Sequence, residues 1–162
     1  MIDDTDRKIL ELLQADARMT HTAIAQAVGL SAPSVLERIR KLEAKGIIKG
    51  YRAIVDSAAL GRPITAFIRI SSDAAPGPYD EFLKSVASAA REPEILECHS
   101  VAGEDCFVLK AKVAGPGDLE ALLGRLRNSG RIGRTVSMIV LSTLKEDTIL
   151  PTHTTPIKHA KR

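Results

Sequence analysis

The sequence predicts an α+β fold in two parts, a small helical part followed by a part with an antiparallel sheet. Three observations support this prediction. Residues 20–45 read as two short helices joined by a glycine turn, and the second half follows the order strand, helix, strand, strand, helix, strand. Between them, residues 57–63 are small and contain glycine and proline, as linkers do. A chain of 162 residues is long enough for two small domains.

Residues 20–45 have the outline of a helix-turn-helix. Thr20 stands where an N-cap accepts a backbone N–H, and Gly29 ends the first helix because a residue just past a helix end commonly needs a positive φ. Leu30 is expected to reach the core between the helices, and Ser31 caps the second helix. The apolar residues of that helix recur at i, i+4 and i+7 and are expected to point inward: Val35, Ile39 and Leu42.

The outer face of the second helix carries hydroxyl and guanidinium groups, which a DNA recognition helix needs. Arginine can bridge two acceptors on guanine or clamp a phosphate, and basic residues outnumber acidic ones between residues 38 and 52. A solvated amphipathic helix followed by a lysine-protected strand edge is the alternative explanation. The predicted DNA-binding residues are Ser31, Ser34, Glu37, Arg38, Arg40, Lys41, Lys45, Lys49 and Arg52.

Two further elements complete the helical part. An earlier helix, capped by Asp3 or Asp4 and running to about Ala15, is expected to pack under the helix pair. Residues 47–56 alternate loosely between apolar and polar types, which predicts a short strand or wing. We place a winged helix-turn-helix DNA-binding domain at residues 1–52 and a linker at residues 53–63.

The second half predicts a four-stranded antiparallel sheet with two helices on one face, the ferredoxin-like βαββαβ arrangement. A second copy of the chain is expected to cover the other face, because four apolar strand residues exceed what one helical layer can bury: Phe107, Val136, Met138 and Val140. Strands are expected at residues 64–70, 95–101, 106–113 and 134–144, a turn at 74–78, and helices at 79–90 and from 118 to Gly130. We assign residues 64–147 to this effector-binding and oligomerisation domain and residues 148–162 to a flexible basic tail.

Other function classes find little support in the sequence. The N-terminus is acidic and polar and no apolar run could span a membrane, so a cytoplasmic protein is expected. Cys98 and Cys106 are expected to be free thiols, with a disulfide across a hairpin as the alternative. Glu97, Cys98 and His99 cannot all bind one metal, because adjacent strand residues point to opposite faces. We therefore expect no enzyme, no metal site and no cofactor.

Four segments together resemble one known family, the leucine-responsive and asparagine-response (Lrp/AsnC, feast/famine) transcriptional regulators. They are DDTDRKILELLQADAR, AVGLSAPSVLERIRKLEAKGIIKGY, VAGEDCFVLK and TVSMIVLSTLKE, in this order along nearly the whole chain. The resemblance implies binding to double-stranded DNA, a small effector that is commonly an amino acid, and homodimers that assemble into tetramers or octamers. The alternatives are a siroheme-decarboxylase-like enzyme, which shares the two-part architecture, and an architectural protein that compacts DNA.

The resemblance also implies an effector site between dimers, near the turn that joins the second and third strands of the sheet. Here that region comprises Ser100, Val101, Ala102, Gly103, Glu104 and Asp105. An amino acid is a zwitterion, so Gly103 would allow backbone N–H groups to approach its carboxylate, and Glu104 or Asp105 would take its ammonium group. A solvated hairpin tip is the alternative.

Two residues in this turn depart from the family pattern. Ala102 stands where threonine is usual, and Cys106 aligns with a position that is often acidic. Either the effector chemistry has changed, or Asp105 substitutes from the neighbouring position.

Overall fold

A computed structural model describes residues 2–71, 78–146 and 149–152. The chain divides into two compact units, one formed by residues 1–54 and the segment from residue 145 onward, the other by residues 55–144. Apart from residue 78, the turn expected at residues 74–78 lies outside the described residues. None of the helices in the described ranges is long and apolar enough to cross a membrane.

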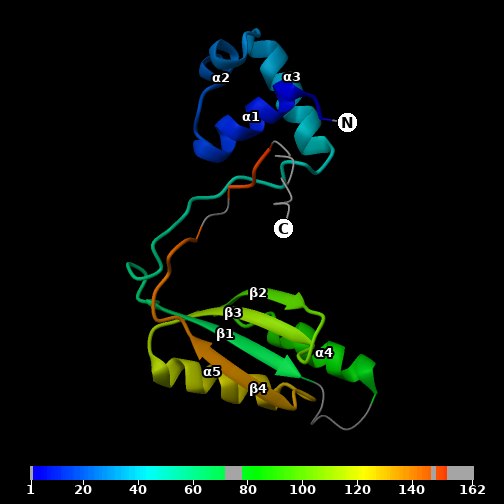
Figure 1. Ribbon diagram of the computed structural model, residues 1–162, viewed down its shortest axis with the longest axis vertical. Helices are drawn as coiled ribbons and strands as arrows, with labels where there is room; N and C mark the ends of the chain where they lie inside the picture. Colours follow the sequence, from blue (N-terminus) through cyan, green and yellow to red (C-terminus); the bar gives the residue numbers. More distant parts are fainter. Residues whose placement is uncertain (1, 72–77, 147–148, 153–162) are drawn as a thin grey trace, which may run out of the picture. The chain divides into compact units, whose positions relative to one another are not determined.

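The first unit contains three helices, α1 (Asp4–Ala15), α2 (His21–Val28) and α3 (Ala32–Ala44) (Figure 1). Helix α1 begins at a capping box: Asp3 Oδ1 accepts from the Asp6 N–H at 2.7 Å, and Asp6 Oδ2 accepts from the Asp3 N–H at 3.2 Å. The helices bury a common apolar core of Ile9, Ile24, Ala25, Val35 and Ile39. Val35, Ile39 and Leu42 are all buried, which confirms the expected inward face of α3.

The ends of α2 and the start of α3 are capped as expected. Thr20 Oγ1 accepts from the Ala23 N–H at 3.2 Å, Gly29 has φ +70°, and Ser31 Oγ accepts from the Ser34 N–H at 3.3 Å. The expectation that Leu30 enters the core is wrong, because its side chain is 37% exposed. Its N–H donates to the Ala25 carbonyl at 3.0 Å, which closes the C-terminal end of α2.

Residues 47–56 do not form the expected strand. The N–H groups of Ile47 and Ile48 donate to the Leu42 carbonyl at 2.9 and 3.2 Å, which closes α3, and Ile48 packs against the helical core. Tyr51 donates its hydroxyl to Glu43 Oε1 at 3.0 Å. Burial raises the pKa of Tyr51, and this hydrogen bond adds to the effect. In the part of the chain that the structure describes, no strand pairs with this segment.

The second unit is an antiparallel sheet with strand order β2-β3-β1-β4 (Figure 1). Its elements, in chain order, are β1 (Ile64–Ser71), α4 (Tyr79–Ala89), β2 (Ile95–Ser100), β3 (Phe107–Val113), α5 (Pro116–Asn128) and β4 (Arg134–Ile139). This order confirms the ferredoxin-like βαββαβ arrangement.

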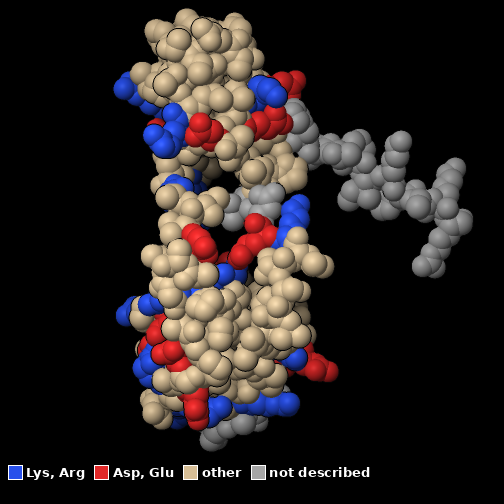
Figure 2. Space-filling model, turned by 90° about the vertical axis from the view of Figure 1, so that its left-hand side faces the viewer, with Lys and Arg blue, Asp and Glu red and all other residues tan. Residues whose placement is uncertain are grey.

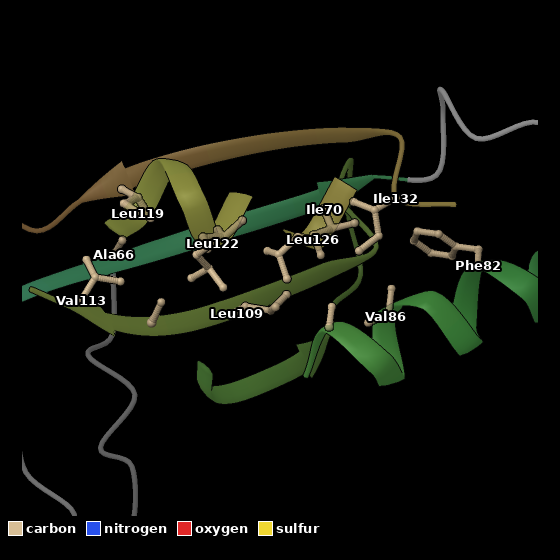
Figure 3. Close-up of a cluster of buried hydrophobic side chains, with 13 residues drawn as sticks. Ala66, Ile70, Phe82, Val86, Leu109, Val113, Leu119, Leu122, Leu126 and Ile132 are labelled. Atoms are coloured by element: carbon tan, nitrogen blue, oxygen red, sulfur yellow. The ribbon is translucent and has the colours of Figure 1, made fainter. Parts of the chain in front are cut away.

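The core of this unit lies between the sheet and the two helices, which cover the same face (Figure 3). Phe107 also belongs to this side. It pairs in register with the buried Ile70, and its ring centroid lies 5.9 Å from that of Phe82 on α4. The expectation that Phe107 lies on the open face is therefore wrong, because its side chain points to the face that the helices cover. The buried core residues include Ala66, Ile68, Ile70, Phe82, Val86, Leu109, Val113, Leu119, Leu122 and Leu126.

The opposite face of the sheet has no helix over it in the described ranges. Phe67 pairs in register with Met138 there, and Arg69 with Val136. Met138 is 44% exposed. This face also holds Glu97 and His99, whereas Cys98 packs toward the helical core, so the three residues diverge as strand geometry requires.

Cys98 and Cys106 are thiols rather than a disulfide, as expected. Burial raises the pKa of Cys98.

Candidate DNA-binding surface and effector turn

One side of α3, beside the start of α1, forms a depression of about 350 Å³. Ser34, Glu37, Arg38, Lys41 and Lys45 line it, together with Asp6, Leu30 and Leu42. These α3 residues recur every three to four positions, so they share one side of the helix. The structure therefore brings five of the nine predicted DNA-binding residues onto one surface, which we call the α3 surface.

Ser31 caps the N-terminal end of α3, and Ser34 lies in its first turn. Their hydroxyl oxygens lie 2.8 Å apart, and both residues are exposed. The free N–H groups and the dipole at a helix N-terminus favour an anion, so this end of α3 suits a DNA phosphate.

Arg38 is held by the capping box of α1. Its Nη1 lies 2.7 Å from Asp3 Oδ2 and 2.7 Å from Asp6 Oδ1. These hydrogen bonds, that of Asp3 first, raise the pKa of Arg38 above its usual value. The Asp6 backbone N–H, followed by Arg38, lowers the pKa of Asp3. Arg38 therefore ties α3 to the start of α1, a positioning contact that the sequence did not indicate.

Glu37 and Lys41 form an exposed ion pair along α3. Lys41 Nζ lies 2.6 Å from Glu37 Oε1, with the side chains 65% and 68% exposed. The hydrogen bond from Lys41 lowers the pKa of Glu37. Exposed pairs of this kind contribute little stability, so Lys41 can exchange its carboxylate for a phosphate at low cost.

Four other predicted cations, Arg40, Lys45, Lys49 and Arg52, are exposed, and none forms an ion pair with any residue that the structure describes. Figure 2 shows basic and acidic side chains interspersed on the face in view, rather than one uniformly positive surface. Among the predicted residues, these four exposed side chains on and after α3 are therefore cations available to DNA.

The effector site is predicted in the turn between β2 and β3, at residues 100–105, which we call the effector turn. The turn continues the pairing of its flanking strands. The Val101 N–H donates to the Cys106 carbonyl at 3.0 Å, and the Cys106 N–H donates to the Ile70 carbonyl at 2.9 Å. Gly103 has φ +141°, a conformation that favours glycine, and the space beside its Cα is open. Ser100 ends β2, and Val101, Ala102, Gly103 and Glu104 are exposed. The backbone of the turn is thus accessible for close approach.

The two acidic residues of the turn differ in their contacts. Asp105 accepts from Nε of Arg69 on β1, and its side chain is only 18% exposed, whereas Glu104 is exposed. Arg69 is a candidate site residue that sequence reasoning missed, since it lies 36 residues before Asp105. The β1–β3 register places it opposite Val108, so a strand alignment could have indicated it.

Two family models match the chain. The model for a winged helix-turn-helix DNA-binding domain matches residues 2–49, and the model for the Lrp/AsnC ligand-binding domain matches residues 65–150. The two matches cover both compact units, including the α3 surface and the effector turn.

Relatives and solved structures agree with these matches. The chain is 38% identical to the HTH-type transcriptional regulator LrpA of Mycobacterium tuberculosis, over 90% of this chain and 94% of the relative. It is 34% identical to the leucine-responsive regulatory protein of Salmonella typhimurium, over 90% and 88%. A transcriptional regulator from Neisseria meningitidis, solved in complex with L-methionine, superimposes with a TM-score of 0.84 at 30% identity, covering 93% of this chain and 97% of that one. The protein therefore belongs to the Lrp/AsnC family and is a DNA-binding transcriptional regulator with a ligand-binding domain.

Proposed function

We propose that α3 enters the major groove of DNA and that the unpaired cations on and after it make the essential contacts. The observation that carries this proposal is the division of the basic residues: Arg38 is engaged with Asp3 and Asp6, whereas Arg40 and Lys45 are exposed without an ion pair in the described ranges. Arg40 then reads a base or clamps a phosphate, and Arg38 holds the helix in place.

The proposed effector is a small zwitterion, an amino acid, bound at residues 100–105. The exposed turn offers backbone N–H groups near Gly103 and a free carboxylate at Glu104, which suit the two charges of an amino acid. Relatives support this class: one structural relative was solved with L-methionine, and sequence relatives are named as leucine-responsive and glutamate uptake regulators.

We further propose that the protein works as a homodimer in the cytoplasm. The uncovered sheet face carries Phe67, Val136 and Met138, an apolar surface that a second copy would bury. A dimer presents two α3 helices to successive major grooves and so recognises a pseudo-palindrome. Further assembly into tetramers or octamers would place effector sites between dimers.

Salt titration of operator binding tests the DNA contacts. Arg40→Ala is expected to weaken binding about 10-fold and to reduce the slope of log affinity against log salt by about 1 if Arg40 contacts a phosphate, or to relax specificity at one base position if it contacts a base. The matched control is Arg127→Ala, an exposed arginine on α5, which should leave both quantities unchanged. If Arg40→Ala changed neither affinity, slope nor specificity, the proposed α3 contact would be wrong.

A thermal-shift screen of the twenty amino acids tests the effector class. A ligand at 100 times its Kd stabilises the folded protein by about 2.7 kcal/mol, so at least one amino acid should raise the melting temperature. Glu104→Gln should abolish that rise while the unliganded protein melts as before. No shift with any of the twenty would exclude an amino-acid effector, and an absorbing tetrapyrrole in the purified protein would instead favour the enzyme alternative.

A further inference from the structure

Helix α1 carries a polar stripe that is not part of the α3 surface. Arg7, Glu11 and Gln14 recur at i, i+4 and i+7, so they lie on one side of the helix. All three hydrogen-bond to residues 149–152, a segment that follows α1 by more than 130 positions in the chain and belongs to the same compact unit (Figure 1).

The contact at Gln14 is reciprocal. Its Nε2 donates to the Leu150 carbonyl at 3.0 Å, and its Oε1 accepts from the Leu150 N–H at 2.7 Å. A side-chain amide thus satisfies both the donor and the acceptor of one residue, as a neighbouring strand would.

Thr152 occupies the other end of the stripe. Its hydroxyl donates to Glu11 Oε1 at 2.6 Å, and its carbonyl accepts from Arg7 Nη1. The segment therefore runs antiparallel to α1, with Leu150 at Gln14 and Thr152 nearer the start of the helix.

Pro151 lies between the two contact residues and suits this geometry. Proline has no N–H to satisfy, and it biases the residue before it away from helical backbone. Ile149 and Leu150 are 52% and 72% exposed, so the segment is held by hydrogen bonds rather than by apolar burial. Contacts of this kind depend on the particular groups present, which makes the fit specific to this sequence.

Residues 149–152 return to the first unit after the chain has passed through the second. The chain leaves the first unit after Ile54 and rejoins it at Lys145, after passing through the ligand-binding unit. We propose that residues 149–152 form a strap that docks on the polar stripe of α1 and gives the DNA-binding unit a second connection to the ligand-binding unit. The strap binds the helix whose capping box holds Arg38, so it acts on the element that positions α3.

A double-mutant cycle tests the docking. Gln14→Ala should lower the melting temperature of the first unit by about 3–6 °C in the full chain, since it removes two hydrogen bonds from a unit of this size. In a chain that ends after Glu146, the same substitution should shift melting by less than about 1 °C. The control is Gln26→Ala, an exposed glutamine on α2, which should have the same small effect in both chains. Equal shifts for Gln14→Ala in both chains would overturn the strap.

Hydrogen exchange of the Leu150 amide provides a second measurement. This N–H should exchange at least about 10-fold more slowly in the full chain than in Gln14→Ala, and the Gln26→Ala control should retain the protection. Protection that disappears on dilution would mean that the strap belongs to a second copy, and it would overturn the intramolecular connection. Neither measurement uses DNA or an effector, so the strap can fail while the proposed function stands.

Discussion

Helix α3 and the effector turn each contain a pair of like-charged residues whose members have different surroundings. Each has two residues of like charge close together in the sequence: Arg38 and Arg40 on α3, Glu104 and Asp105 in the turn. In each, one residue is engaged by a partner distant in the sequence, while the other is exposed. Neighbouring residues of like charge therefore have different surroundings, and under the proposed function one holds the site in shape while the other is available to a ligand.

The largest expected effect separates the two acidic residues of the turn. Asp105→Ala removes the partner of the partly buried Arg69 and should destabilise the second unit by about 1 kcal/mol, a fall of about 4–8 °C in melting temperature. Glu104→Ala, at an exposed position, should change stability by no more than about 0.5 kcal/mol. Calorimetry of both variants checks the comparison, and similar melting temperatures would remove the distinction between the two carboxylates.

A smaller effect separates the two arginines of α3. Arg38→Met keeps the length of the side chain but loses both ion pairs to α1, so the first unit should melt about 2–4 °C lower. Arg40→Met should leave melting unchanged and weaken DNA binding. The two variants should therefore rank in opposite order by thermal unfolding and by the salt dependence of operator binding. The same order in both assays would contradict separate roles.

The smallest expected effect is on the melting temperature of the protein at low pH. The pKa of Asp3 is lowered in the folded protein from its usual 3.8, so its charge stabilises the fold fully above that pH, and this contribution is lost as the pH falls through the folded pKa. Asp3→Asn retains an N-cap side chain but removes the charge. The variant should melt slightly lower than the natural chain at pH 6, and the difference should begin to narrow as the pH falls below about 4. A difference that did not narrow at all between pH 4 and pH 3 would show that the charge is not its cause.

The elements were predictable because their signals are local. The i, i+4, i+7 spacing of Val35, Ile39 and Leu42 correctly gave the buried face of α3, and the strand and helix order correctly gave the ferredoxin-like sheet. Local signals also produced the errors. The position of Leu30 just after the glycine turn predicts a core residue, but its side chain is 37% exposed.

The partners of the charged residues were not predictable in the same way. Arg38 lies 32 and 35 residues from its carboxylates, and Arg69 lies 36 residues from Asp105. Only the packing of α1 against α3, and the register of β1 on β3, bring these groups together. The type of each site residue could be read from the sequence, whereas its availability depended on tertiary contacts.

The order of synthesis decides when the strap can dock on α1. Helix α1 is synthesised at the start of this sequence, and the residue that binds Gln14 follows 136 positions later. At ribosomal rates of about 5–20 residues per second, the polar stripe of α1 waits roughly 7–27 s for its partner. The helix-turn-helix can fold from local contacts during that time, but Leu150 and Thr152 reach it only after the whole ligand-binding unit has been synthesised. A nascent chain therefore carries a DNA-binding unit without its strap, and only a chain synthesised past Thr152 can complete it.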